Sequence, residues 1–117
     1  MAKIILVIDD NEGILEGFQA VLESAGYSVR LAPDANNLFA GNTTYPDLIL
    51  LDVLLSGQDG RDICKRIKSE IQTLQIPVLM MSAAPHVENS IKDAGADDYL
   101  LKPFEMELLL AKIAAYI

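Results

Sequence analysis

The sequence predicts a doubly wound α/β fold, in which helices cover both faces of a parallel sheet. The first indication is the segment from Asp47 to Asp52, whose four central residues are all apolar. Such a run is typical of a strand buried on both faces, and Pro46 before it and Gly57 after it favour a short strand over a helix. The second indication is that strand-like and helix-like segments alternate along the whole chain, which favours parallel strands joined by right-handed crossovers.

Five strands and five helices make up this alternation. The expected strands are apolar runs, and they cover residues 3–8, 27–31, 47–52, 76–81 and 97–101. The expected helices carry apolar residues at helical spacing, and they cover residues 12–25, 34–40, 61–71, 86–94 and 105–117. Asn11 can cap the first helix and Gly26 can end it, while Ile71 is expected on the buried face of the third. Residues 53–60 are rich in turn formers and are expected to form an irregular loop.

Length and composition narrow the class of protein. A chain of 117 residues is expected to form one domain, over residues 1–117. The net charge of −8 argues against direct binding of a nucleic-acid backbone, which requires patches of Lys and Arg. No apolar run approaches the length of a membrane span and no signal-peptide pattern is present, so we expect a cytoplasmic chain without membrane contact. Cys64, the single cysteine, excludes an internal disulfide and predicts a small buried side chain.

Polar side chains follow four of the apolar strands at the point where each strand ends. They are Asp9-Asp10, Asp52, Ser82 and Lys102. The carboxyl ends of parallel strands meet at one edge of a sheet, which is where open α/β sheets bind their ligands. Three carboxylates at one edge repel one another unless a cation joins them, and hard oxygen ligands suit Mg²⁺. A carboxylate supported by a metal can attack phosphorus, with Lys102 and Ser82 holding the transferred phosphoryl group.

Each of these residues also has a plain structural interpretation. Asp9-Asp10 could form a helix-capping turn, and Asp52 could cap the turn that follows its strand. Ser82 could be a strand-end hydroxyl, and Lys102 a solvated surface charge. The functional interpretation rests on their combination, since all four strand ends carry complementary chemistry.

With these motifs in place, the chain resembles the receiver domain of bacterial two-component response regulators, of the chemotaxis-regulator type. The resemblance covers essentially all 117 residues. Its motifs are Asp9-Asp10, Asp52 followed by residues 57–60 (Gly-Gln-Asp-Gly), Ser82-Ala83, and residues 98–104 (Asp-Tyr-Leu-Leu-Lys-Pro-Phe). It implies a flavodoxin-like five-stranded sheet with strand order 2-1-3-4-5. It also implies a switch rather than a turnover enzyme, which takes a phosphoryl group from a histidine kinase, a phosphotransfer protein or a small phosphodonor.

The resemblance also assigns roles to residues. Asp52 is the phosphoacceptor, in a domain that assists its own phosphorylation and dephosphorylation. Asp9 and Asp10 bind Mg²⁺ together with Asp52 and the backbone carbonyl of Leu54.

The remaining implied roles concern the switch. Ser82 is the switch hydroxyl, Lys102 binds the phosphoryl group, and Tyr99 is the switch aromatic, expected to move inward from an exposed position. The surface of the fourth helix, fifth strand and fifth helix would then change and control an output domain or protein partner. The Lys102–Pro103 peptide bond is expected to be cis, as in the family.

The chain departs from the family pattern in three places. Ser56 stands where the family usually has proline. Leu54 and Ala84 are apolar at two variable positions that flank the phosphoryl group, so neither side chain can orient an attacking water. The stretch from Ser82 to Lys102 is slightly shorter than usual, which leaves open a weak homodimer through the fourth and fifth helices.

Two other functions remain alternatives at this point. A Mg²⁺-dependent phosphatase acting through an aspartyl phosphate would use similar acids, but enzymes of the haloacid-dehalogenase type carry a second aspartate where this chain has Leu54. An interaction module that signals without phosphorylation would not need the complete set of acids.

Overall fold

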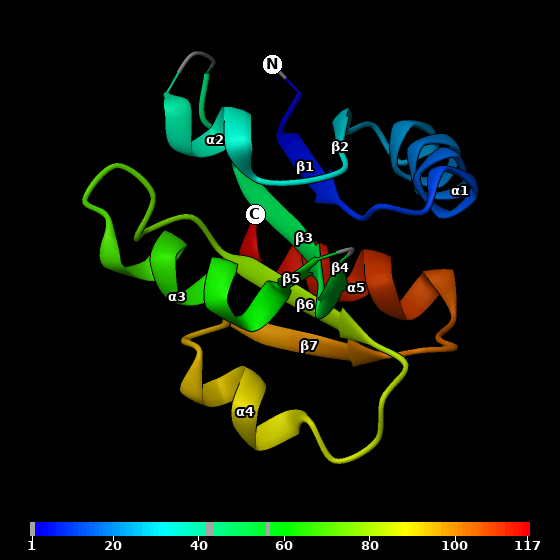
Figure 1. Cartoon of the computed structure of the whole chain (residues 1–117). Coiled ribbons are helices and arrows are strands. Elements are labelled where there is room, and N and C mark those ends of the chain that lie inside the picture. Colours follow the sequence, from blue (N-terminus) through cyan, green and yellow to red (C-terminus); the bar gives the residue numbers. More distant parts are fainter. Residues whose placement is uncertain (1, 42–43, 56) are drawn as a thin grey trace.

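The computed structural model describes residues 2–41, 44–55 and 57–117, so the departure at Ser56 lies outside the described residues. A five-stranded parallel sheet forms its centre, with the strands in the order β2-β1-β3-β6-β7 (Figure 1). In chain order these strands are β1 (Ile4–Ile8), β2 (Ser28–Ala32), β3 (Leu48–Asp52), β6 (Val78–Ser82) and β7 (Asp98–Leu101). The predicted order 2-1-3-4-5 is therefore confirmed, and β3 lies in the middle of the sheet.

Helices cover both faces of this sheet, as the alternating pattern predicts. They are α1 (Glu12–Ser24), α2 (Asn36–Ala40), α3 (Gly60–Ser69), α4 (Glu88–Asp93) and α5 (Met106–Tyr116). The helices α1 and α5 lie on one face, and α2, α3 and α4 lie on the other (Figure 1). Within the described part of the chain, none of these helices is both long and apolar enough to cross a membrane.

Alternate residues of the strands supply two apolar cores, one under each helical layer. In β3, Ile49 and Leu51 pack under α2, α3 and α4, whereas Leu48 and Leu50 pack under α1 and α5. All five residues of β3 are buried, as expected of a strand covered on both faces. Cys64 lies in the first of these cores, and burial raises the pKa of its thiol to about 11, so it acts as an apolar side chain.

The capping residues act where the sequence places them. The Asn11 side chain accepts a hydrogen bond from the Ile14 N–H at 3.2 Å and so caps α1. Gly26 follows α1 with φ of +95°, a conformation in which a side chain would be strained.

Three local predictions are wrong. Part of residues 53–60 is regular, because Leu54–Leu55 (β4) and Gln58–Asp59 (β5) pair as a short antiparallel ladder. Ile71 is 82% exposed rather than buried, because α3 ends at Ser69 and the chain turns away from its inner face. The fourth helix begins at Glu88 rather than at residue 86, since His86 has φ of +60° and cannot continue a helix.

Candidate functional site

Four strand ends bring their polar side chains to the carboxyl edge of the sheet. Asp9 follows β1, Asp52 ends β3, Ser82 ends β6, and Lys102 follows β7. Because the strands are parallel, these ends lie along one edge, as predicted. Asp9, Asp52 and Ser82 are buried, although each is polar, so these side chains depend on partners within the protein rather than on solvent.

Lys102 joins the two buried acids. Its Nζ lies 3.1 Å from Asp52 Oδ2 and 3.7 Å from Asp9 Oδ2. The shorter contact is a hydrogen bond between charged groups, and the longer one is an ion pair without a hydrogen bond. The structure thus brings together Asp9, Asp52 and Lys102, although Asp9 and Lys102 lie near opposite ends of the sequence.

Asp9 carries an unsatisfied oxygen. Its Oδ1 accepts a hydrogen bond from the Asn11 N–H at 3.0 Å, but its buried Oδ2 has no hydrogen-bond partner. Burial, and after it the negative charge of Asp52, raise the pKa of Asp9 above the ordinary range, against the lowering effects of Asn11 and Lys102. An unpartnered carboxylate oxygen beside a second carboxylate is a fitting ligand for a hard cation such as Mg²⁺.

The other expected metal ligands are less closely gathered. Asp10 is exposed, and among the described residues no three acidic, His or Cys side chains converge as a complete metal site. The Leu54 N–H donates to Asp52 Oδ1 at 3.2 Å, which holds the start of β4 beside the Asp52 carboxylate. The donor set therefore fits Mg²⁺ in its chemistry, through the orphaned oxygen of Asp9 and the adjacent Asp52.

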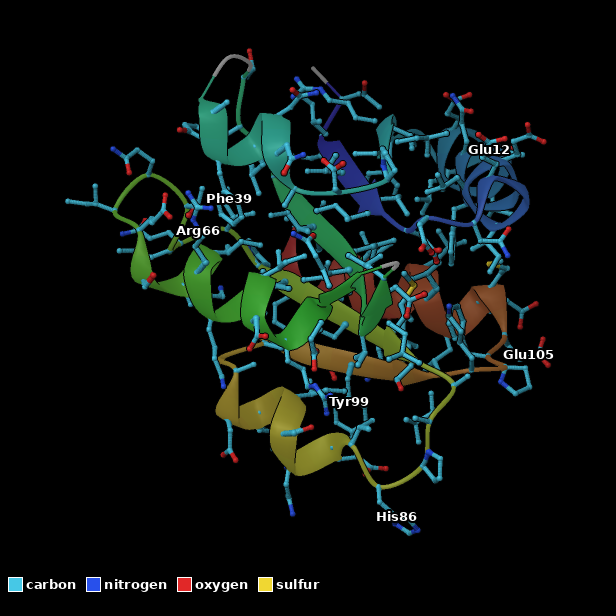
Figure 2. The ribbon with its side chains drawn as sticks, viewed as in Figure 1. Glu12, Phe39, Arg66, His86, Tyr99 and Glu105 are labelled. Atoms are coloured by element: carbon cyan, nitrogen blue, oxygen red, sulfur yellow. The ribbon has the colours of Figure 1, made fainter. Side chains whose placement is uncertain are left out.

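Ser82 and Tyr99 lie on the two neighbouring strands that complete this side of the sheet. Ser82 Oγ accepts a hydrogen bond from the Ala84 N–H at 3.0 Å, and Ser82 pairs with Leu101 in the ladder to β7. Tyr99 is half-buried between β7 and α4 (Figure 2) and packs against the core that also contacts Ala84. The expectation of an exposed Tyr99 is therefore wrong: the ring already rests partly on the α4 side.

One further expectation around the site is confirmed, since the Lys102–Pro103 peptide bond is cis. His86, the single histidine of the sequence, is exposed in the segment before α4 and points away from the molecule (Figure 2).

Asp59 and Gly60 belong to one of the motifs of the family resemblance and Arg61 was given no role, but the sequence did not predict how these three residues pack beside Asp52. Asp59 caps α3 by accepting from the Arg61 N–H at 2.8 Å. Gly60 lies so close to Asp52 that an added Cβ would come within 2.0 Å of the Asp52 carbonyl oxygen. The signal was present as an Asp-Gly pair at the start of a helix, which is a capping pattern.

A sheet of this order, with carboxylates at the ends of its first and central strands and a lysine after its last strand, is typical of a class of phosphoacceptor signalling domains. Comparison with known proteins identifies the family within this class. The family model of the response regulator receiver domain matches residues 5–114. The chain belongs to this family, whose members are the phosphoacceptor switches of two-component signalling.

Individual relatives agree with this membership. The chain is 40% identical over 116 residues to the DNA-binding dual master transcriptional regulator RpaA of Synechocystis, covering 97% of this chain and 48% of the relative. A crystal structure of a putative response regulator from Chloroflexus aurantiacus superposes with a TM-score of 0.91 at 33% identity, covering 99% of this chain and 98% of the other.

A third comparison bears on the metal. The receiver domain of a sensor histidine kinase from Pseudomonas aeruginosa, described with a magnesium ion coordinated in its active site cleft, superposes with a TM-score of 0.87 at 26% identity. It covers 99% of this chain and 98% of that one. Receiver domains bind Mg²⁺ in this cleft.

Proposed function

We propose that Asp52 is the residue that accepts the phosphoryl group, with Mg²⁺ held beside it. The observation that carries the proposal is the pairing of Asp52 Oδ2 with Lys102 Nζ at 3.1 Å, next to the buried and unsatisfied Oδ2 of Asp9. The Lys102 ammonium group can bind an anionic group on Asp52, and the unsatisfied oxygen of Asp9 can bind a cation in addition to Lys102.

Each residue has a task in the transfer. An oxygen of Asp52 forms a bond to phosphorus, while the bond from phosphorus to the nitrogen or oxygen of the donor breaks and the donor leaves with the electron pair. Lys102 Nζ, freed from part of its contact with Asp52, holds an oxygen of the transferred group. Asp9, Asp10, Asp52 and the Leu54 carbonyl would hold Mg²⁺, which supplies neutralisation of the charge that gathers on these oxygens.

The output of the transfer depends on Ser82 and Tyr99. A phosphoryl group on Asp52 adds strong acceptor oxygens and negative charge, to which the Ser82 hydroxyl can donate if it moves toward Asp52. That movement would free space beside Ala83 and Ala84, and Tyr99 would turn further inward from its half-buried position. The phosphoryl group biases this change only through its different contacts in the two states.

The switch can be tested by NMR with beryllofluoride, which mimics an acyl phosphate. We expect large shift changes at Tyr99 in the wild type and clearly smaller ones in Ser82→Ala, which should still accept phosphate at Asp52. A full response at Tyr99 in Ser82→Ala would show that the two residues are not coupled.

The partners follow from the family. Receiver domains interact with histidine kinases and with output domains. The chain spans about half the length of the curated relatives it matches, since it covers 48% of RpaA. RpaA is a transcriptional regulator that binds DNA, and its likeness supports an output in transcription for this chain, exercised by another domain or protein in the cytoplasm. The net charge of −8 argues that these residues do not themselves contact nucleic acid. We also propose that the domain forms a weak homodimer.

Intact-mass spectrometry after incubation with acetyl phosphate and Mg²⁺ tests the acceptor. We expect one added phosphoryl group in the wild type and none in Asp52→Asn. Asp47→Asn is the matched control, because Asp47 precedes the same strand at its opposite end, where its carboxylate accepts a hydrogen bond from the Ile4 N–H at 2.7 Å. Equal labelling of wild type and Asp52→Asn would overturn the assignment. Sustained hydrolysis of a phosphate monoester would instead support the phosphatase alternative.

A further inference from the structure

Arg61 connects α3 to α4. Its Nη1 donates a hydrogen bond to Ser90 Oγ at 3.1 Å, across 29 positions of sequence. Ser90 Oγ in turn donates to the Val87 carbonyl at 2.8 Å. The side chain of Arg61 thus reaches from the first turn of one helix to the middle of the next.

Asp59 fixes the guanidinium of Arg61 from the other side. Arg61 Nη2 lies 2.6 Å from Asp59 Oδ2, and Arg61 Nε lies 2.9 Å from Asp59 Oδ1. This two-point contact gives the planar guanidinium a defined orientation. The side-chain hydrogen bond from Arg61 lowers the pKa of Asp59, so the carboxylate remains charged.

Asp59 is itself held against the acceptor. It pairs with Leu54 in the β4–β5 ladder, and the Leu54 N–H donates to Asp52 Oδ1 at 3.2 Å. The Gly60 N–H donates to the Val53 carbonyl at 2.7 Å, and Gly60 lies directly against the Asp52 backbone. A change at the Asp52 carboxylate therefore acts on the same ladder that holds Asp59 and Arg61.

The helix at the far end of this path depends on outside contacts. The helix α4 has six residues, and its N-cap residue Val87 makes no side-chain capping hydrogen bond. A helix of this length is not stable by itself and takes its stability from tertiary contacts. Ser90 sits at its centre, so the hydrogen bond from Arg61 bears on the whole helix.

We infer that Arg61 is a positioning residue that couples the β4–β5 ladder beside Asp52 to α4, by a path separate from Ser82 and Tyr99. The coupling rests on the proposed function of Asp52, but the contact that carries it exists in the unphosphorylated chain. A displacement of Leu54 and Asp59 at the acceptor moves the guanidinium, and with it the anchor of Ser90.

Hydrogen exchange of the unphosphorylated protein tests the contact. The Ile91 and Ala94 amides are bonded within α4, at 2.9 and 3.0 Å. We expect Ser90→Ala and Arg61→Met to accelerate their exchange about fivefold, which corresponds to roughly 1 kcal/mol for one hydrogen bond.

Two matched controls separate this contact from general effects. Arg66→Met removes the same charge from the same helix, but Arg66 stacks on Phe39 at 3.8 Å on the α2 side (Figure 2). Ser69→Ala removes a hydroxyl bonded to a carbonyl three residues earlier, as in Ser90, but among the described residues no guanidinium donates to this hydroxyl. Neither control should change exchange in α4. Unchanged exchange in both Ser90→Ala and Arg61→Met would overturn the contact.

The response to beryllofluoride tests the coupling. We expect Ser90→Ala to retain the wild-type shift change at Leu54 and at Tyr99 but to lose at least half of the change at Ile91. A full response at Ile91 in both Ser90→Ala and Arg61→Met would overturn the coupling. If the wild type itself neither responds nor accepts phosphate, the proposed function fails and the coupling with it, while the exchange experiment still decides whether Arg61 anchors α4.

Discussion

Both edges of the central sheet carry aspartates, but the two edges differ in how well the aspartate oxygens are matched by hydrogen-bond donors. At the amino edge, each carboxylate is matched by donors: Asp47 accepts from the Ile4 N–H, and Asp98 accepts from Lys112 Nζ at 2.9 Å. At the carboxyl edge, Asp9 and Asp52 share one lysine, and one oxygen of Asp9 is left without a hydrogen bond. The difference shows that an aspartate at a strand end indicates function when it is buried beside a second carboxylate and the two share one cation, not merely when it is present.

Asp97 shows how complete the amino-edge contacts are. Its Oδ2 accepts from Lys68 Nζ at 2.7 Å and from the Val78 N–H at 2.8 Å. Lys68 also donates to the Ile76 carbonyl at 2.7 Å, so one lysine and one carboxylate tie α3 to the starts of two strands. These contacts satisfy Asp97 Oδ2 and stabilise the fold.

The largest effect is expected when the lysine at each edge, Lys102 or Lys68, is replaced by methionine. Lys102→Met should reduce labelling of Asp52 by acetyl phosphate roughly a hundredfold, since it removes the cation that faces the transferred group. Lys68→Met should leave the labelling rate of the folded protein unchanged, although it destabilises the fold. Rates are read by intact-mass spectrometry at a temperature where both variants are folded. Comparable losses in the two variants would mean that the edges do not divide function from stability.

Exchanging one aspartate at each edge should give stability changes of opposite sign. Asp97→Ala should lower the free energy of unfolding by about 2–3 kcal/mol, because it deletes a charged partner of Lys68 and of a backbone N–H. Asp9→Asn should raise it in EDTA, because burial and the charge of Asp52 oppose the ionised form of Asp9. Urea unfolding followed by circular dichroism measures both. A destabilised Asp9→Asn would contradict the idea of an unsatisfied acid at the carboxyl edge.

The sequence predicted the parallel sheet and the residues at its carboxyl edge for a physical reason, whereas the strand order was implied by the family resemblance. A strand such as Leu48–Asp52 is buried on both faces and therefore reads as an apolar run, and its terminal carboxylate stands out against that run. Parallel strands then place Asp9, Asp52, Ser82 and Lys102 together without any knowledge of the side chains between them.

What the sequence did not reveal depends on contacts between distant residues. The β4–β5 ladder pairs only two residues of each strand, which is too short to produce a recognisable alternation of apolar and polar residues in the sequence. The bond from Arg61 to Ser90 joins two polar residues whose patterns indicate only solvent-facing positions. Ile71 continued the apolar spacing of α3, but the helix ends at Ser69, and no glycine or proline marked that end. The half-buried position of Tyr99 was likewise set by packing against α4.

The response to Mg²⁺ sharpens the comparison at the carboxyl edge. Mg²⁺ at ten times its dissociation constant should stabilise the wild type by about 1.4 kcal/mol, since it binds the folded state alone. Asp10→Asn should raise the melting temperature in EDTA and reduce this gain, because it removes a negative charge next to Asp9 in the sequence and one of the proposed Mg²⁺ ligands. Asp98→Asn at the amino edge is the control and should keep the full gain. Thermal melts with and without Mg²⁺ measure the differences. A wild-type melting temperature that does not change in millimolar Mg²⁺ would contradict the proposal that Asp9, Asp10 and Asp52 bind the ion.

The smallest expected effect is the pH dependence of the amino edge. Burial alone would raise the pKa of Asp98, but the hydrogen bonds from Lys112 and from the Tyr99 N–H outweigh it, so the pKa lies below the ordinary value of 3.8. A carboxyl group with a depressed pKa in the folded state adds stability that is complete above its ordinary pKa and is lost as the pH falls through the folded value. The free energy of unfolding of the wild type should therefore exceed that of Asp98→Asn by about 0.5–1 kcal/mol at pH 7 and at pH 5, and by less at pH 3.

Lys112 provides the control for this dependence. In a Lys112→Met background, Asp98→Asn should cost little at any of the three pH values, because the charge that lowers the pKa of Asp98 is gone. Urea unfolding of the four proteins completes a double-mutant cycle at each pH. A coupling between Asp98 and Lys112 that stays constant from pH 7 to pH 3 would show that the carboxylate charge is not what holds this edge together. The contrast between a satisfied and an unsatisfied edge would then have to rest on Asp47 and Asp97 alone.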